Sequence, residues 1–393
     1  MVLDSVCPSC GVEEMSSFYT VRNVPVHSCI MFSSEKDARD FPRGNIELGL
    51  CKNCGFISNM AFDANVQDYS PLYEDQQCYS PTFSAFAKGL AAHLIEKYDL
   101  HGKRVVEVGC GKGDFLALMC EMGNNRGVGI DPSCEKDRIE SAAADRITII
   151  QDYYSERYSH YTGDMVMCRH TLEHVHDTRR FVETIRKGIG DHRDTVVFFE
   201  IPEVSIVLAN LVFWDIYYEH CSYFSPGSLA RLFRSCRFEV LDVSIGFDDQ
   251  YLLIEAKPVG APPETRHPLE ESVEEMIRRV EHFRSGVERQ KDGWKRLVAD
   301  LHAEGKRPVI WGSGSKCVAF LTTLGIDREI GCVVDINPRR HGKYIAGVGK
   351  RIMPPDYLRE FKPGTIIVMN PIYKGEIART AAEMGVTADI VTV

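Results

Sequence analysis

Two pairs of cysteines near the start of the chain have the spacing of metal ligands. Two residues separate Cys7 from Cys10 and Cys51 from Cys54, and a glycine follows each pair directly. Thiolates at this spacing can hold one metal ion from a tight turn, and two such turns complete a tetrahedron of sulfur ligands. We therefore expect these four residues to bind a structural zinc, with four ordinary thiols as the alternative.

The segment between the two pairs is longer than the usual spacing of a zinc ribbon, so a strand-rich insertion must bring the pairs together. Strands are expected at 28–32 and 45–50. His27 and Cys29 lie in the same segment and leave a mixed ligand set open. We give this alternative little weight, because a single histidine is more often a hydrogen-bonded core or surface residue.

A second group of residues has the arrangement of a nucleotide-binding loop. An apolar run at 103–108 is followed by Gly109, Gly111 and Gly113 and then by a helical pattern. Glycines let the backbone approach a ligand closely, and the helix offers the positive end of its dipole. A second apolar run ends in Asp131, where a carboxylate can accept hydrogen bonds from both hydroxyls of a ribose.

Three histidines fall within the stretch 170–177 and suggest a metal. His170 and His174 have the i, i+4 spacing of a helical zinc motif, but the glutamate directly precedes the second histidine. That order is wrong for a zinc protease. We therefore expect no catalytic metal in this stretch.

A cluster of tyrosines, an acid and a histidine lies at 214–225. An imidazole titrates near neutrality, so His220 can act as a general base, and the adjacent Glu219 would fix its tautomer or raise its proton affinity. Tyr217 is close by in the sequence. Taken alone, such a segment is usually an amphipathic stretch whose aromatic residues lie in the core.

The elements that must position these residues alternate between helix and strand. A helical pattern covers 86–98, and strands are expected at 103–108 and 127–130. This order predicts an α/β fold with a Rossmann-like sheet.

A proline-rich segment at 256–265 separates a second α/β region from the first. A long helix is expected at 268–302, and its apolar rhythm suits a coiled-coil dimer or, more simply, docking within the chain. A strand, a glycine turn and a helix follow at 307–316. Because this loop, Gly-Ser-Gly-Ser, lacks a third glycine, we expect a weak or absent second nucleotide site.

Length and composition exclude several classes of protein. The 393 residues exceed one hydrophobic core, and we expect three domains at 1–68, 69–257 and 268–393. A hydrophobic content of 44% excludes disorder, and a net charge of -10 disfavours nucleic acid as a partner. The sequence lacks a long apolar run and an export signal, so we expect a cytoplasmic monomer or homodimer with no membrane partner.

The spacing of the glycines separates two classes of cofactor. Dinucleotide enzymes use G-x-G-x-x-G, whereas Gly-Cys-Gly-Lys-Gly preceded by Glu107 resembles the first motif of the class I S-adenosylmethionine-dependent methyltransferases. The resemblance implies that Gly109, Gly111 and Gly113 line the methionine and ribose side of the cofactor. It also implies that Glu107 orients the methionine amine.

Later segments extend this resemblance. Asp131 would hold the ribose, and 147–154 looks like the third strand and loop of the family, with Asp152 placed to meet the adenine amine. Residues 165–170 resemble the fourth strand. A histidine just past that strand lies beside the transferable methyl group in this fold, so His174 is a candidate for substrate contact, with a solvent-facing loop residue as the alternative.

Over nearly its whole length, the chain resembles the bacterial nucleotide-sugar C-methyltransferases, which combine a zinc-binding domain, a methyltransferase domain and a C-terminal α/β domain. The motifs are CPSC with CKNC, VEVGCGKGD, YYEHCSYFS, GSGSK and VDINPRRHGKY. The resemblance implies S-adenosylmethionine and structural zinc as cofactors and a nucleotide-linked keto-deoxysugar as substrate. It implies His220 as catalytic base, Glu219 and Tyr217 beside it, and Tyr79 and His174 near the sugar.

Methylation at carbon requires a carbon nucleophile. A 4-keto sugar supplies one once a base, here His220, removes the proton next to the carbonyl. Tyr79 or Tyr217 would donate a hydrogen bond to the enolate oxygen, whose charge is costly in a dry pocket. These steps require no metal.

Residues 246–251 depart from the family pattern. Members that methylate a sugar carbon tend to carry a glycine pair here, whereas this chain has Asp248, Asp249 and Gln250. These residues would hold the hydroxyls of another sugar, indicate O-methylation with His220 acting on an alcohol, or form a solvated turn. A non-catalytic scaffold that binds zinc and a nucleotide is the third class of function left open.

Overall fold

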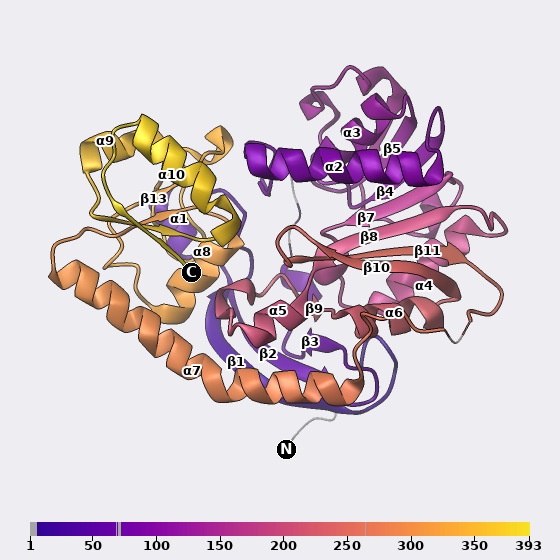
Figure 1. The fold of residues 1–393 in the computed structure, drawn as a ribbon, viewed down its shortest axis with the longest axis horizontal. Helices are drawn as coiled ribbons and strands as arrows, with labels where there is room; N and C mark the ends of the chain where they lie inside the picture. The colour runs from indigo at the N-terminus through magenta and orange to yellow at the C-terminus, as the bar shows by residue number, and fades with distance from the viewer. Residues whose placement is uncertain (1–5, 68, 70–71, 264) are drawn as a thin grey trace.

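The computed structural model of the protein describes residues 6–67, 69, 72–263 and 265–393. Within them the chain forms three sheets of four, seven and five strands, with helices on their faces (Figure 1). The predicted class, α/β with Rossmann-like sheets, is confirmed.

The first sheet is antiparallel and has the order β1-β2-β3-β9. Its strands are β1 (Met15–Pro25), β2 (Arg43–Cys51), β3 (Ile57–Asn59) and β9 (Ser222–Tyr223). The strand expected at 45–50 is confirmed as part of β2. The strand expected at 28–32 is wrong: Ile30 and Phe32 make only isolated bridges, because the long β1 pairs with β2 in its place.

The second sheet has the order β10-β11-β8-β7-β4-β5-β6. Five neighbouring strands, β8, β7, β4, β5 and β6, are parallel to one another. The strands β11 and β10 continue the sheet beyond β8 and are antiparallel. The strands are β4 (Arg104–Val108), β5 (Arg126–Ile130), β6 (Ile147–Ile150), β7 (Met165–Arg169), β8 (Val196–Pro202), β10 (Phe238–Gly246) and β11 (Tyr251–Pro258). The strands predicted over this region are confirmed.

Helices cover both faces of this sheet, because successive residues of a buried strand point to opposite sides. Val105 belongs to the apolar cluster that includes α2 (Pro81–Tyr98) and α3 (Asp114–Met122). Val106 belongs to the cluster on the other face, with α4 (Thr178–Ile189) and α6 (Pro226–Ser235). The helix expected at 86–98 begins earlier, at Pro81, where the Ser80 hydroxyl accepts a hydrogen bond from the third helical amide.

The third sheet is entirely parallel, with the order β14-β13-β12-β15-β16. Its strands are β12 (Val309–Trp311), β13 (Val333–Val334), β14 (Ile352–Met353), β15 (Thr365–Val368) and β16 (Asp389–Thr392). The remaining helices near this sheet and elsewhere are α1 (Glu35–Arg39), α5 (Val204–Ala209), α8 (Ser315–Leu324), α9 (Leu358–Phe361) and α10 (Lys374–Glu383).

The long helix α7 (Val273–Ala303) joins the three regions. It starts later than expected because Ser272 caps it, accepting a hydrogen bond from the amide of Glu275. Its apolar stripe packs in one cluster with residues of β1, α5 and α8, so docking within the chain is the outcome (Figure 1). The buried members of the stripe are Met276, Val280, Phe283, Val287, Trp294, Val298 and Leu301.

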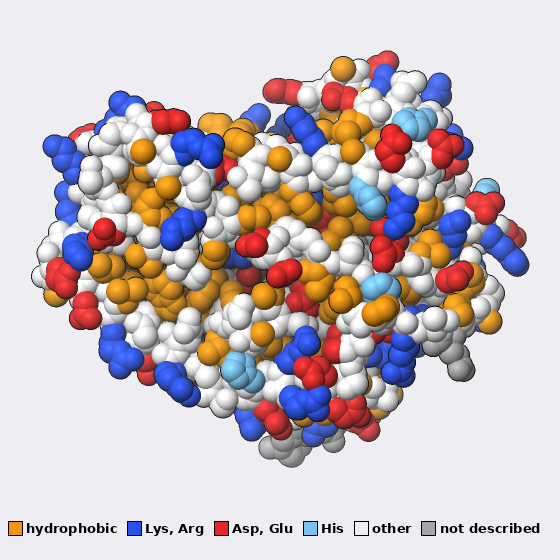
Figure 2. Space-filling view, in the orientation of Figure 1, with side chains coloured by type: hydrophobic (Ala, Val, Ile, Leu, Met, Phe, Trp, Pro, Cys, Tyr) orange, Lys and Arg blue, Asp and Glu red, His pale blue; other side chains and the backbone are white. Residues whose placement is uncertain are grey.

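Acidic and basic side chains are interspersed over the face of the molecule shown in Figure 2, and apolar groups gather where α7 and α8 lie. Among the described residues, we find no helix with both the length and the apolar character needed to cross a bilayer.

Candidate active site

A cavity of about 700 Å³ lies between the second and third sheets. Its wall includes the ends of β4, β5 and β7, the segment before α2, the loop before β9 and the first turn of α8. A cavity of this size can enclose most of a large ligand. Of the predicted site residues, it is lined by Glu107, Gly109, Gly111, Asp131, Tyr79, His174, Tyr217 and His220.

Glu107 stands near the end of β4 and is only 2% exposed. One of its carboxylate oxygens, Oε2, has no hydrogen-bond partner among the described residues. Burial raises the pKa of this carboxyl to about 8, although the charge of Arg169 opposes the shift. A cation at this point would supply the missing partner, so the residue fits the amine of a methionine group.

The glycine turn that follows lets a ligand approach the backbone. Gly109 has a φ of +71°, and a side chain there would meet Thr171 at 2.0 Å. Gly111 has a φ of +52°, and a Cβ atom there would face open space. Its amide donates to Asp131 Oδ2 at 2.9 Å, which fastens the turn to the end of β5. Gly113 caps α3 and shapes the turn, but it does not line the large cavity.

Asp152 follows β6 and is not one of the residues that line the cavity. Its carboxylate accepts hydrogen bonds from Tyr158, Arg157 and the amide of Tyr153. Tyr153 and its neighbour Tyr154 do line the cavity. A contact between Asp152 and the adenine amine therefore stays a prediction.

Another part of the cavity wall contains two histidines whose rings lie close together. The rings of His174 and His220 are perpendicular, with their centres 4.8 Å apart, and the ring of Tyr217 lies 4.1 Å from that of His220. One possible ligand atom each from Glu173, His174 and His220 lies within 4.8 Å of the others, so these groups could hold a cation. Burial holds the pKa of His220 well below its ordinary value, and the charges of neighbouring basic groups act in the same direction.

A buried ion pair lies behind these histidines. Arg169 donates two hydrogen bonds to Glu200, at 2.9 and 3.0 Å, and His170 Nε2 lies 2.9 Å from the same carboxylate. Burial alone would lower the pKa of His170, but hydrogen bonds with Glu173 and Glu200 raise it to about 9. All three histidines of the stretch 170–177, His170, His174 and His176, line the cavity.

Glu219 differs from its predicted placement beside the His220 ring. It is fully buried, does not line the cavity, and bonds instead to His27 Nδ1 at 2.8 Å, to the amide of Ser28 at 3.3 Å and to Ser315 Oγ at 3.2 Å. Side chains of adjacent residues in an irregular segment can point in different directions. The Glu219 carboxylate therefore does not bond to the His220 ring, although the two residues are neighbours in the sequence. His27 is therefore a carboxylate partner, and neither it nor Cys29 joins the sulfur cluster.

The turn at 246–251 has two unlike parts. Asp248 and Asp249 are exposed, with positive φ values, whereas Gln250 lines the cavity. The Gln250 side chain exchanges two hydrogen bonds with Asn370, at 3.1 and 2.8 Å, and accepts a third from Lys316 at 3.0 Å. It thus connects the second sheet to the third, a role that the sequence did not reveal.

The four predicted metal ligands come together. Cys7 Sγ lies 3.7 Å from Cys54 Sγ, and Cys10 Sγ lies 3.6 Å from Cys51 Sγ. Metal–sulfur bonds of about 2.3 Å in a tetrahedron require sulfur separations of roughly 3.8 Å, so the cluster fits a metal ion. All four cysteines are free of disulfides.

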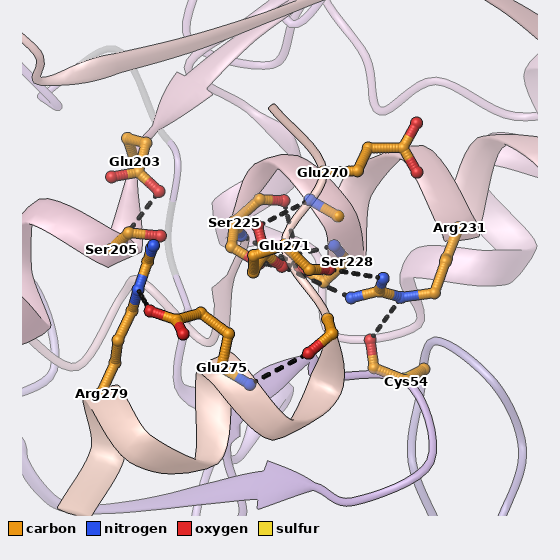
Figure 3. A network of polar contacts seen from close by, with 12 residues as sticks. Cys54, Glu203, Ser205, Ser225, Ser228, Arg231, Glu270, Glu271, Glu275 and Arg279 are labelled. Carbon is orange, nitrogen blue, oxygen red and sulfur yellow. Dashed lines mark hydrogen bonds and ion pairs between the residues drawn. The ribbon is translucent and has the colours of Figure 1, made fainter. Parts of the chain in front are cut away.

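Two arginines from helices on the second sheet donate hydrogen bonds to the cysteine turns. Arg179 of α4 donates to the carbonyl of Ser9 at 2.9 Å, and Arg231 of α6 donates to the carbonyl of Cys54 at 3.0 Å. The Arg231 guanidinium also contacts Glu271, which lies just before α7. Figure 3 shows Arg231 between Cys54 and Glu271. The two cysteine turns are therefore attached to helices that pack on the second sheet, next to the cavity.

Comparison with known proteins gives matches over most of the chain. Residues 83–243 match the family described as methyltransferase domain, and residues 268–389 match the C-methyltransferase C-terminal domain. The chain is similar to the C-methyltransferase NovU of Streptomyces niveus, with 28% identity over 70% of this chain and 68% of that protein.

Two solved structures show weaker likeness. One is the magnesium protoporphyrin IX methyltransferase of Synechocystis PCC 6803 with bound SAH, at 12% identity and a TM-score of 0.37, covering 47% of this chain and 90% of that one. The other is the 1,6-didemethyltoxoflavin-N1-methyltransferase of Burkholderia thailandensis, at 15% identity and a TM-score of 0.33, covering 46% and 84%.

The domain matches and the cavity set aside the hypothesis of a non-catalytic scaffold. Glu107, the glycine turn and Asp131, all within the matched methyltransferase domain, line the cavity. The chain is an S-adenosylmethionine-dependent methyltransferase whose methyltransferase domain is followed by the C-terminal domain of the C-methyltransferases.

Proposed function

We propose that this enzyme methylates the carbon next to the ketone of a nucleotide-linked keto-deoxysugar. The observation that carries this proposal is the buried His220, which lies beside His174 and Tyr217 in the same cavity as Glu107. Burial holds the pKa of His220 below its ordinary value, so at neutral pH the ring has a lone pair that can accept a proton. The similarity to NovU supports methylation at carbon.

The proposed reaction needs a base and a hydrogen-bond donor, and the chain supplies both. S-adenosylmethionine, when bound, supplies an electrophilic methyl group. His220 accepts the proton next to the ketone, and a tyrosine hydroxyl, from Tyr217 or Tyr79, donates a hydrogen bond to the enolate oxygen. Burial, with the charge of Asp215, raises the pKa of Tyr217 well above its ordinary value, so its hydroxyl keeps the proton that it donates.

The cofactor would be held by residues at the ends of β4 and β5. Glu107 would bind the methionine amine, Gly109 and Gly111 would allow close approach of the backbone, and Asp131 would bind the ribose hydroxyls. We retain Asp152 as the proposed contact to the adenine amine.

The metal in the four-cysteine cluster is proposed to be zinc with a structural role. Four thiolates at the separations given above suit zinc and complete its tetrahedron, leaving no position for substrate. The cluster also lacks contact with the cavity lining, which agrees with a structural role.

O-methylation is the alternative reaction, and its motivation was the polarity of residues 248–250. Asp248 and Asp249 lie on an exposed turn and do not line the cavity, which leaves Gln250 as the one member of this stretch that could meet a substrate hydroxyl. Gln250 is already engaged by Asn370 and Lys316. These contacts favour the carbon acceptor.

The test uses S-adenosylmethionine labelled with carbon-13 in the methyl group and a pool of nucleotide-linked keto- and hydroxy-sugars. NMR of the products distinguishes a methyl group on carbon from one on oxygen. We expect a carbon-bound methyl from a keto-sugar, and none from the hydroxy-sugars. A methyl group on oxygen would overturn the proposed acceptor while leaving the cofactor site in place.

A further inference from the structure

Glu219 is held by residues from two distant parts of the chain. Its Oε2 atom bonds to His27 Nδ1 and to the amide of Ser28, just after β1, and its Oε1 atom accepts a hydrogen bond from Ser315 at the start of α8. His27 and Glu219 are both fully buried. A buried carboxylate is costly unless it is paired, so these contacts fix the position of the segment that contains His220.

The same segment contacts the second histidine. The backbone carbonyl of Glu219 lies 3.1 Å from His174 Nδ1. A carbonyl oxygen can only accept, so this contact is a hydrogen bond when Nδ1 carries a proton. Tyr69 adds its hydroxyl at 2.9 Å from the same nitrogen, and the Tyr69 ring packs edge-on against His27 at 5.1 Å.

The direction of the Glu219 pKa agrees with this pairing. Burial would raise the pKa, but the hydrogen bond and charge of His27 lower it. The carboxylate therefore keeps its charge, and with it the bonds to His27 and Ser315. A loss of His27 would leave a buried charge with weaker partners, and the loop between Glu219 and β9 would be free to shift.

We propose that His27 is a positioning residue for methyl transfer: through Glu219 it fixes the orientation of His174 and His220. Ser315, in the C-terminal region, donates a further hydrogen bond to the same carboxylate. This inference rests on the proposed function, in which His220 is the base. It assigns to the N-terminal region a part in the reaction that is separate from its metal cluster.

The first experiment compares His27→Leu with His27→Asn. The leucine removes the hydrogen bond, whereas the asparagine amide can donate from near the position of Nδ1. A shift of about 1 Å in a catalytic group can cost on the order of 100-fold in rate. We therefore expect kcat to fall by about 10- to 100-fold in His27→Leu and by less than about 5-fold in His27→Asn, with KM for S-adenosylmethionine unchanged within about 2-fold. The assay substrate is whichever pool sugar the wild type methylates.

The matched control is His267→Leu, which removes another histidine–carboxylate contact, at 3.3 Å from Asp242 and away from the cavity. Its kcat should equal that of the wild type. Ser315→Ala serves as the second variant if His27→Leu does not fold, with an expected loss of about 3- to 10-fold in kcat. Wild-type kcat in His27→Leu, no difference between the leucine and asparagine variants, or wild-type kcat in Ser315→Ala would overturn the proposal.

A measurement without any acceptor separates this inference from the proposed function. Nitrogen-15 NMR of labelled imidazoles, assigned with His174→Asn and His220→Asn, reports the tautomer and surroundings of each ring. We expect the His174 and His220 signals to move in His27→Leu and to stay in His267→Leu. If they move while the wild type methylates none of the pool, the reaction assignment fails and the positioning is supported; if they do not move, the positioning fails.

Discussion

The cofactor side and the acceptor side of the cavity are built in different ways. Glu107, Gly109, Gly111 and Asp131 all come from two neighbouring strands and the turn between one of them and its helix. The acceptor side joins His27, His174, His220 and Ser315 from segments spread over most of the chain. One side is therefore fixed by local structure, and the other depends on how the three sheets pack against each other.

The largest expected effect is on the acceptor side alone. His220→Asn keeps a polar group but removes the proposed base, so kcat should fall by about 1,000-fold or more, a loss typical of a general base. The affinity for S-adenosylmethionine, measured by calorimetry, should stay within about 2-fold, because no cofactor ligand changes. A variant with near wild-type turnover would show that another group removes the proton.

Loss of the four-cysteine cluster should lower kcat more than it lowers the affinity for the cofactor. The second cysteine turn leads directly into β3, which pairs with β9, just after His220. We expect Cys54→Ser to lower kcat by about 10- to 100-fold and to lower the melting temperature, as loss of a structural metal does. Bound metal, measured by elemental analysis, should fall in parallel. Equal losses in kcat and in cofactor affinity would contradict the separation of the two sides.

Glu107 allows a test confined to the cofactor side. Its pKa of about 8 lies above the value of an exposed carboxyl, so the free enzyme should lose stability as the pH rises from about 5 to 8. Affinity for the cofactor amine should rise over pH 6 to 8, because only the ionised carboxylate pairs with it. Thermal unfolding and calorimetry across this range measure both slopes. Glu107→Gln should flatten them and weaken cofactor binding by about 10-fold. Unchanged slopes would remove Glu107 as the amine ligand.

The smallest expected effect concerns the connection between the sheets. Gln250→Ala removes hydrogen bonds to Asn370 and Lys316 at the rim of the cavity. We expect KM for the acceptor to rise by about 3- to 10-fold with kcat nearly unchanged, because the lost hydrogen bonds lie at the rim of the cavity. Steady-state kinetics with the pool substrate measure this, and Asp249→Ala, on the exposed part of the same turn, is the matched control. A fall in kcat of the same size in both variants would assign the effect to the turn as a whole.

The sequence predicted the cofactor side well because its signals are local. A strand, a glycine turn and a helix follow one another, so the placement of Glu107, Gly109 and Asp131 could be predicted from spacing. The metal cluster was also predictable, since each pair of cysteines forms its own turn. Gly113 and Asp152 show the limit: the motif located them in the right loops but not on the cavity wall.

The acceptor side was predicted in its residues but not in its contacts. His220 and Tyr217 were recognised from their residue types, whereas the partner of Glu219 lies 192 residues away. Spacing says nothing about a pair so distant, and a single histidine such as His27 gives no periodic signal. The strand expected at 28–32 was wrong for a related reason, because β-sheet propensity depends on which partner strand is available.

The pairing of β3 with β9 has a consequence for how the chain is made. Synthesis proceeds from the N-terminus, so the cysteine turns and β3 are complete roughly 160 residues before β9 emerges. At about 5 to 20 residues per second, this interval is roughly 10 to 30 s. During that time one edge of β3 stays unpaired, and an open strand edge is a site for association with other chains. A metal ion that binds the cysteines early would hold β3 in place until β9 is available to cover its edge.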